Sequence, residues 1–128
     1  MKLFFYLRSL AVGKGGTERV ATELAGEMAS RGHTVFFAYP TDGEAPAYAM
    51  SESVGTIPLP KGAGMITTAS EMAKQLSPDT LVCFYANPFI YEAVLLQSLT
   101  NLPLILQECS NPYRVVADNW IQTYEPKE

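Results

Sequence analysis

A glycine-rich turn between an apolar run and an amphipathic segment constrains the fold most strongly. Residues 13–19, GKGGTER, follow the apolar run at 3–7 and lead into a segment with helical periodicity at 18–31. The first N–H groups of a helix have no intrahelical partner, and the helix dipole is positive there. Glycines let the backbone come close to a phosphate and adopt a positive φ. The order of strand, glycine turn and helix therefore predicts an anion site at the start of the first helix.

The spacing of these glycines excludes two common nucleotide motifs. After Gly13 and Gly15, Glu18 stands where the third glycine of the dinucleotide fingerprint G-x-G-x-x-G would be. The phosphate loop G-x-x-x-x-G-K-[ST] is also absent. A tight turn with no ligand remains the alternative interpretation of the glycine pair.

The rest of the chain alternates between strand and helix patterns. Strands are predicted at residues 2–7, 33–39, 54–59, 80–85 and 102–106, and helices at 18–31, 62–76, 87–99 and 111–120. This alternation, without hairpin signals, predicts an α/β fold with a doubly wound parallel sheet in the order 3-2-1-4-5. Pro58 and Pro60 place the third strand at an edge. Ligands of such sheets bind at the carboxyl ends of the strands, so loops 8–16, 85–87 and 107–112 are expected to line the site.

Caps and apolar stripes give the expected helix ends and faces. Thr17 is the predicted N-cap of the first helix, and Asn87 and Asn111, each followed by proline, are predicted to cap the third and fourth helices. Apolar residues at helical spacing are expected to face the sheet. They are Val20, Leu24 and Met28 with Ala21, Ala25 and Ala29 in the first helix. In the third helix, Phe89, Ile90, Ala93, Val94 and Gln97 lie on successive turns.

Charge and cysteine content narrow the function classes. A net charge of −4 disfavours binding to nucleic acid. No apolar run approaches the roughly 18 residues of a membrane span. Cys83 and Cys109 are expected to be unpaired thiols in a reducing compartment. They lack metal-ligand spacing, and His33, the single histidine, is expected to be structural. No metal or other cofactor is therefore expected.

Two segments resemble the N-terminal domain of family-4 glycosyltransferases, which have the GT-B fold. Residues 15–25, GGTERVATELA, and 28–35, MASRGHTV, are similar to the family pattern G-G-[AT]-E-R-x-x-x-x-L-A followed by R-G-H-x-V. Residues 106–112, LQECSNP, are similar to S-E-[HR]-[SN]-x-P after the fifth strand. Glu108 and Pro112 match, whereas Cys109 replaces a histidine or arginine. In relatives that have this histidine, the histidine lies close to the transferred sugar. Cys109 cannot supply the positive charge that a histidine would bring there.

The resemblance implies a Rossmann-like domain, the N-terminal half of a GT-B enzyme. Such a domain binds the acceptor of a retaining hexosyltransferase (EC 2.4), which moves a sugar from a nucleotide-sugar to a glycan or lipid-linked acceptor. The glycine turn is then expected to contact the donor phosphates, and Glu108 to be a catalytic carboxylate or a structural hydrogen-bond acceptor. The implied residues are Gly15, Gly16 and Thr17 for donor phosphates, and Arg8, Tyr85, Asn87, Ser110 and Asn111 for the acceptor.

The resemblance also sets expectations about partners and location. Residues 1–128 are expected to form one domain, and the donor-binding domain, with its E-x7-E pair of glutamates, is missing from these residues. We therefore expect no sugar transfer by this chain alone. The expected location is the cytoplasm, with peripheral contact at the inner face of the membrane as a variant. The alternative function is a non-catalytic α/β module that binds a small anion or a protein partner.

Overall fold

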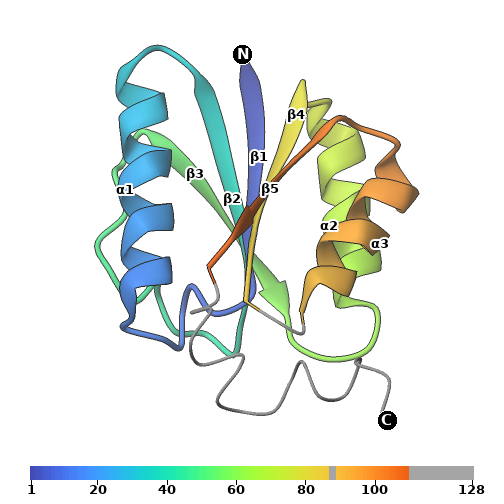
Figure 1. The fold of residues 1–128 in the computed structure, drawn as a ribbon, viewed down its shortest axis with the longest axis horizontal. Coiled ribbons are helices and arrows are strands. Elements are labelled where there is room, and N and C mark those ends of the chain that lie inside the picture. Colours follow the sequence, from blue (N-terminus) through green and yellow to red (C-terminus); the bar gives the residue numbers. More distant parts are fainter. Residues whose placement is uncertain (87–88, 110–128) are drawn as a thin grey trace, which may run out of the picture.

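The computed structural model describes residues 1–86 and 89–109, which form a five-stranded parallel sheet (Figure 1). The strand order is β3-β2-β1-β4-β5, and every described pair of neighbouring strands is parallel. The fold class, the strand order and the edge position of the third strand are thus confirmed. The strands are β1 (Lys2–Leu7), β2 (Thr34–Thr41), β3 (Val54–Pro60), β4 (Thr80–Tyr85) and β5 (Leu104–Glu108).

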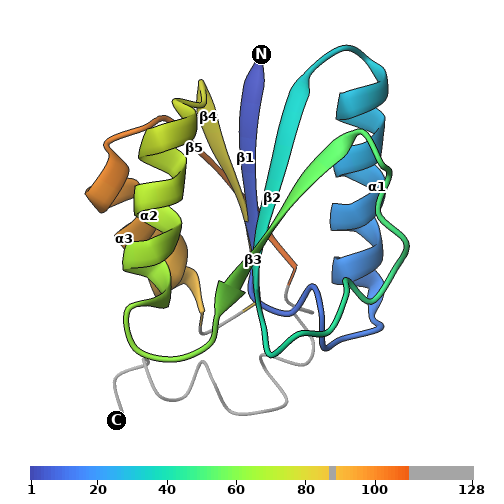
Figure 2. The ribbon, with the colours of Figure 1, turned by 180° about the vertical axis from the view of Figure 1, so that it is seen from behind.

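Helices cover both faces of the sheet. Helix α1 (Gly16–Ser30) lies on one face, while α2 (Met65–Leu76) and α3 (Ile90–Thr100) lie together on the other (Figures 1 and 2). The chain changes faces because α1 links β1 to β2, whereas α2 carries it from the edge strand β3 back across to β4. This reversal beside β1 is the switch point at which doubly wound sheets bind ligands.

The core has two layers that meet at the central strand β1. Phe4 and Tyr6 face α2 and α3, while Phe5 and Leu7 face α1. On the α1 side, the Phe5 ring lies 5.4 Å from the Phe37 ring and 5.7 Å from that of Phe84, between centroids. Burial on both faces explains the continuous apolar run of β1, as is usual for central parallel strands.

Helix α1 buries a narrower face than its sequence predicts. Ala21 and Ala25 are fully buried against the sheet, but Val20 and Leu24 are 53% and 39% exposed. The prediction that Val20 and Leu24 face the sheet is therefore wrong. Alanine lets the helix axis come close to the strands, and this close approach turns the larger neighbours outward.

Helix α3 buries only part of the periodic set that its sequence shows. Glu92, Ala93 and Leu96 are its buried residues, whereas Ile90 and Val94 are exposed. The helix is apolar on most sides, so its periodicity could not identify the inner face. The contact that fixes the rotation is polar, because the buried Tyr6 hydroxyl donates a hydrogen bond to Glu92.

Three elements begin at least two residues later than predicted. Helix α2 begins at Met65 and not at residue 62, because Gly62 and Gly64 adopt positive φ values of 115° and 82°. Helix α3 begins at Ile90 and not at residue 87, with Phe89 as its N-cap residue. Strand β5 begins at Leu104, two residues after its predicted start, since Pro103 has no N–H for the ladder, and it ends at Glu108. The predicted caps Asn87 and Asn111 and the predicted fourth helix lie outside the described residues.

Candidate functional site

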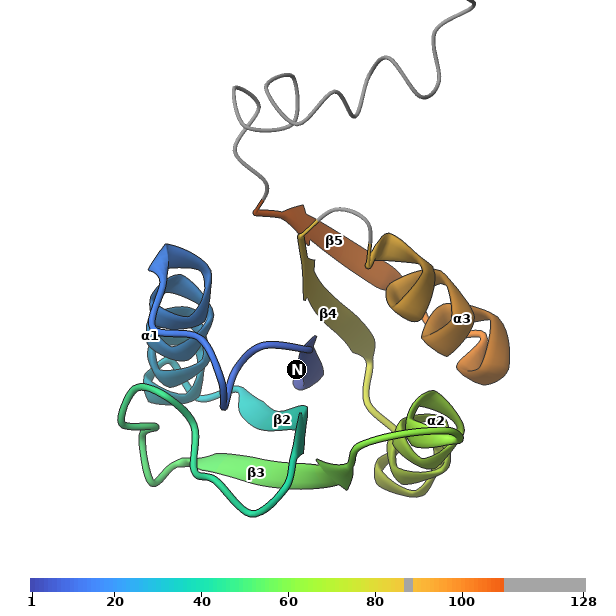
Figure 3. The same cartoon turned by 90° about the horizontal axis from the view of Figure 1, so that it is seen from below.

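The predicted site residues that the structure describes lie at the carboxyl ends of β1, β4 and β5 and at the start of α1. Figure 3 views the sheet from this side. Two hollows open there. The first, called here the glycine crevice, has a volume of about 380 Å³ and is lined by Gly16, Thr17, Val20, Gln107, Glu108 and Cys109. The second, called here the basic pocket, has a volume of about 520 Å³ and is lined by Arg8, Ser9, Val12, Pro40, Lys61, Gly62, Met65 and Phe89.

The glycine crevice joins the start of α1 to the end of β5. Parallel pairing sets Tyr85 of β4 opposite Glu108, and the Cys109 N–H then donates to the Tyr85 carbonyl at 2.8 Å. These contacts hold Glu108 and Cys109 beside Gly16 and Thr17 in one hollow. The two segments that carry the family resemblance thus meet in space, although about 90 residues separate them in the sequence.

The glycines of the turn do not adopt the positive φ that their sequence suggested. Gly15 is extended, with φ −101° and ψ −174°, and the described residues with positive φ do not include Gly15 or Gly16. A Cβ added at Gly16 would meet no atom within 4 Å. Neither strain nor packing therefore requires glycine at position 16, which instead leaves the backbone bare where it lines the crevice.

The Glu18 side chain fills the inner side of the turn. Glu18 is buried, and a Cβ added at Gly13 would collide with its Oε1 atom. At Gly15 the same carboxylate would be 3.6 Å from an added Cβ, an ordinary contact. Gly13 is thus the turn glycine at which an added Cβ would have to displace a side chain, because the Glu18 carboxylate occupies the space beside it.

Thr17 and Cys109 line the crevice from its two sides. Helix α1 begins at Gly16 with Gly15 as its N-cap residue and no side-chain cap bond, so the prediction of Thr17 as N-cap is wrong. Burial raises the pKa of the Cys109 thiol; a hydrogen bond with the Thr17 side chain lowers it in part, and the charge of Glu18 raises it. Cys109 is therefore a neutral thiol at pH 7 and supplies neither a positive charge nor a base.

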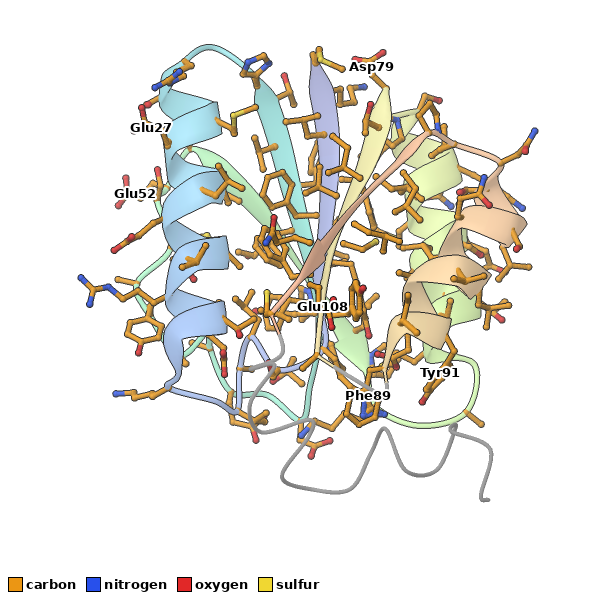
Figure 4. The ribbon with its side chains drawn as sticks, in the orientation of Figure 1. Glu27, Glu52, Asp79, Phe89, Tyr91 and Glu108 are labelled. Carbon is orange, nitrogen blue, oxygen red and sulfur yellow. The ribbon has the colours of Figure 1, made fainter. Side chains whose placement is uncertain are left out.

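A buried carboxylate, that of Glu92, binds the Arg8 side chain of the basic pocket. Arg8 Nε lies 3.3 Å from both carboxylate oxygens of Glu92, and the Tyr6 hydroxyl donates to Glu92 Oε1 at 3.1 Å. The Arg8 guanidinium also lies over the Phe89 ring, 4.3 Å from its centroid. Figure 4 shows Phe89 at this end of the molecule and Asp79 at the opposite end. Carboxylate and ring together fix the direction of Arg8.

Opposing influences act on the ionisation of this cluster. Burial raises the pKa of Glu92, while the Arg8 charge and the Tyr6 hydroxyl lower it in part. The pKa of Tyr6 is raised by burial and by the Glu92 charge, so Tyr6 stays a neutral donor. At the rim of the pocket, Lys61 Nζ lies 3.2 Å from Asp42 Oδ2, and the Asp42 side chain is mostly exposed.

Sequence reasoning missed three residues of the basic pocket and its support. Glu92 carries a signal, because it is the single acidic residue in the apolar run 89–96, FIYEAVLL. Lys61 precedes a second glycine turn, Gly-Ala-Gly at 62–64, which was assigned to a helix. Phe89 was assigned to the apolar face of α3 and instead lines the pocket.

The predicted acceptor residues do not form one cluster. Arg8 lines the basic pocket, whereas the half-buried Tyr85, at the end of β4 beside Glu108, lines neither of the two hollows. Burial first, and then the charge of Glu108, raises the pKa of Tyr85. Asn87, Ser110 and Asn111 lie outside the described residues.

Further observations concern the two cysteines, the single histidine, metal binding and membrane spans. Cys83 and Cys109 are both free thiols, as predicted. His33 Nδ1 lies 3.0 Å from the Met1 ammonium group, at the amino edge of the sheet and away from both hollows. Within residues 1–86 and 89–109, no group of three acidic, cysteine or histidine side chains could hold a metal ion. In the same part of the chain, no helix has the length and apolarity needed to cross a membrane.

Comparison with known proteins supplies one family match. The sequence model of Glycosyltransferase Family 4 matches residues 14–118, which is most of the chain. The match takes in the glycine turn and β5, and so both sides of the glycine crevice. A search of curated proteins gave no match.

Proposed function

The chain belongs to glycosyltransferase family 4, and on that premise we propose that it is the acceptor-side domain of a retaining glycosyltransferase. The parent enzyme transfers a hexosyl group from a nucleotide-sugar donor to a glycan or lipid-linked acceptor. The observation that carries the proposal is the glycine crevice, where bare backbone at the start of α1 meets the carboxylate of Glu108.

In this proposal the glycine turn acts on the departing phosphate. Negative charge grows on the donor pyrophosphate as the sugar leaves. Backbone N–H groups fixed at a helix start stabilise such charge without reorganising, because they already point toward it. The open space at Gly16 lets the phosphate approach this backbone. Thr17 adds a hydroxyl that is not used as a helix cap.

Glu108 and the basic pocket serve the sugar and the acceptor. Glu108 ends β5 with an exposed side chain and lines the crevice, so its carboxylate can accept hydrogen bonds from sugar hydroxyls. The acceptor enters from the basic pocket, where Arg8 is already oriented by Glu92. The loop after β1 contributes to both hollows, with Arg8 and Ser9 in one and the helix start at Gly16 in the other.

Transfer further requires a donor-binding domain with the E-x7-E pair. Holding donor and acceptor in one orientation supplies roughly 7–11 kcal/mol of barrier reduction in favourable cases. In this proposal residues 1–128 form one wall of the cleft, and no transfer is expected from these residues by themselves. The proposal includes no metal ion or other cofactor in the chemistry.

A donor panel tests the proposal directly. The protein that joins this chain to a donor domain is incubated with nucleotide-sugars and candidate acceptors, and the product anomer is assigned by NMR. Product with the donor's anomeric configuration, unaffected by EDTA, is expected, and residues 1–128 alone should match the no-protein control. An inverted product would overturn the retaining mechanism. No transfer with any donor would favour the non-catalytic binding module.

A further inference from the structure

The edge strand β5 is bare on the face of the sheet that carries α1. Helix α1 packs on β1, β2 and β3, while α2 and α3 lie on the opposite face, so no helix of the described residues covers β5 on the α1 side (Figures 1 and 2). Ile105 pairs with Val82, which belongs to the core layer under α1, and therefore points to this face. Ile105 is 56% exposed there.

Helix α1 turns two apolar side chains toward this bare strand. Val20 lines the glycine crevice together with Gln107, so this side of α1 faces β5. Leu24 lies one turn further along the same side of the helix, and both Val20 and Leu24 are exposed. Val20, Leu24 and Ile105 thus border an apolar surface that continues from the glycine crevice along α1, called here the α1–β5 surface.

The chain leaves β5 at the end of this surface. The Cys109 N–H donates to the Tyr85 carbonyl at 2.8 Å, which continues the alternation of β5 by one residue and sets Cys109 on the face of Ile105. The Cys109 side chain packs against the core layer under α1. Residues 110–128 therefore continue from a point beside the start of α1, at one end of the α1–β5 surface.

Residues 112–124 have the sequence pattern of an amphipathic helix. Arg114, Asp118 and Gln122 recur at every fourth position and give a polar side, on which Val115 is the single large apolar residue. A helix over this range would be about 20 Å long, close to the length of α1 at about 22 Å. The other side of the pattern is apolar and consists of Tyr113, Val116, Ala117, Trp120, Ile121 and Tyr124.

We propose that residues 112–124 form an amphipathic helix that docks on the α1–β5 surface, with its apolar side against Val20, Leu24 and Ile105. Docking removes apolar surface of both partners from water. The segment is tethered beside the surface, so its effective concentration there exceeds that of a second copy in dilute solution. Because Val20 also lines the glycine crevice, the docked helix adds a wall to that hollow. The inference does not depend on sugar transfer.

The fluorescence of Trp120 tests the docking, because it is the single tryptophan of the chain. In the folded protein of residues 1–128, acrylamide should quench this fluorescence several-fold less than in urea, at every protein concentration. Nuclear Overhauser contacts should join the Trp120 indole to the methyl groups of Leu24 and Ile105. Equal quenching in the folded and unfolded protein would overturn the docking. Protection that appears only at high protein concentration would overturn the intramolecular contact and identify a second copy as the partner.

Paired variants locate the contact on the surface. Leu24→Gln should shift the docking equilibrium about tenfold toward the undocked segment and increase quenching, because it removes an apolar contact. Ile105→Thr should increase quenching from the β5 side. The matched control is Leu95→Gln, which makes the same change at a similarly exposed position of α3, on the opposite face of the sheet, and should leave quenching unchanged. Far-UV circular dichroism checks that each variant is folded. Unchanged quenching in both Leu24→Gln and Ile105→Thr, or increased quenching in Leu95→Gln, would overturn the assignment to the α1–β5 surface.

Discussion

The two hollows at the carboxyl edge present different charged groups to a ligand. The basic pocket presents the side-chain cations Arg8 and Lys61, whereas the glycine crevice presents backbone, the carboxylate of Glu108 and the neutral thiol of Cys109. Glu18 adds a second carboxylate beside the turn. In the proposed function this difference gives the two hollows two tasks. The pocket takes the acceptor, and the crevice meets the charge that develops on the donor phosphate with the N–H groups at the start of α1.

The two hollows also differ in what holds them in place. The pocket depends on a polar contact in the core, in which Glu92 binds both Arg8 and Tyr6. The crevice depends on packing, because the alanine face of α1 sets the helix start beside β5 and Glu18 fills the turn. Changes to these supports should therefore affect the two hollows independently.

Removing Glu92, which supports the basic pocket, should have the largest effect on the free energy of unfolding. Glu92→Ala leaves the buried Tyr6 hydroxyl unpaired and releases Arg8, so we expect about 3 kcal/mol lower free energy of unfolding. Urea unfolding measures this loss. The control Glu23→Ala removes an exposed carboxylate paired with Arg19 on α1 and should cost less than about 1 kcal/mol. Equal losses in the two variants would contradict a special role for Glu92.

Overfilling the turn of the glycine crevice should have a smaller effect. Gly13→Ala must push the buried Glu18 carboxylate aside, and we expect a cost of about 1–2 kcal/mol in thermal or urea unfolding. Gly15→Ala makes an ordinary contact and should cost less. Adding Glu18→Ala to Gly13→Ala should recover part of the loss, and a purely additive double variant would exclude the collision as the cause.

The pH dependence of stability separates the two supports further. Because burial raises the pKa of Glu92 in the folded state, its contribution is fully present below the ordinary glutamate pKa and is lost as pH rises through the raised value. Glu92→Gln cannot ionise. Wild type should therefore lose stability relative to Glu92→Gln as the pH rises above the ordinary glutamate pKa, measured by urea unfolding at each pH. A difference that stays constant with pH would contradict the raised pKa.

The smallest expected effect is a difference in reactivity between the two thiols. Cys109 reports on the crevice, because it lines that hollow. Burial raises the pKa of Cys83 to about 12, so this thiol should react with a disulfide reagent only after unfolding. Cys109 is partly exposed and should react slowly in the folded protein. A Cys109→Ser variant that still reacts when folded would contradict this order. Two thiols per chain should react after denaturation without reductant.

The sequence predicts the sheet well because its signals are redundant. The apolar run of β1 and the glycine turn each indicate a buried parallel strand followed by a helix, and Pro58 independently indicates an edge. Helix faces were harder to predict. Hydrophobicity favours Val20 and Leu24, yet the small volume of Ala21 and Ala25 decides which face of α1 meets the sheet.

The sequence predicts which residues of the glycine crevice lie together but not those of the basic pocket. Gly16, Thr17 and Glu108 could be assigned to one crevice because strand order alone determines which loops meet. The position of Lys61 depends on the conformation of the turn before α2, and the position of Glu92 depends on the rotation of α3. No local sequence pattern specifies either of them. The role of Glu108 as a catalytic carboxylate stays a prediction.

One pair of glycine variants tests most directly whether bare backbone in the crevice serves catalysis. Gly16→Ala adds a methyl group that contacts no protein atom, while the matched control Gly26→Ala makes an ordinary 3.5 Å contact in the middle of the same helix. Neither should lower stability, because alanine favours helix by up to about 1 kcal/mol over glycine. In the protein that carries the donor domain, turnover per folded molecule should fall at least about tenfold for Gly16→Ala and stay unchanged for Gly26→Ala. Unchanged turnover in both variants would contradict the account and leave the glycine turn a structural feature.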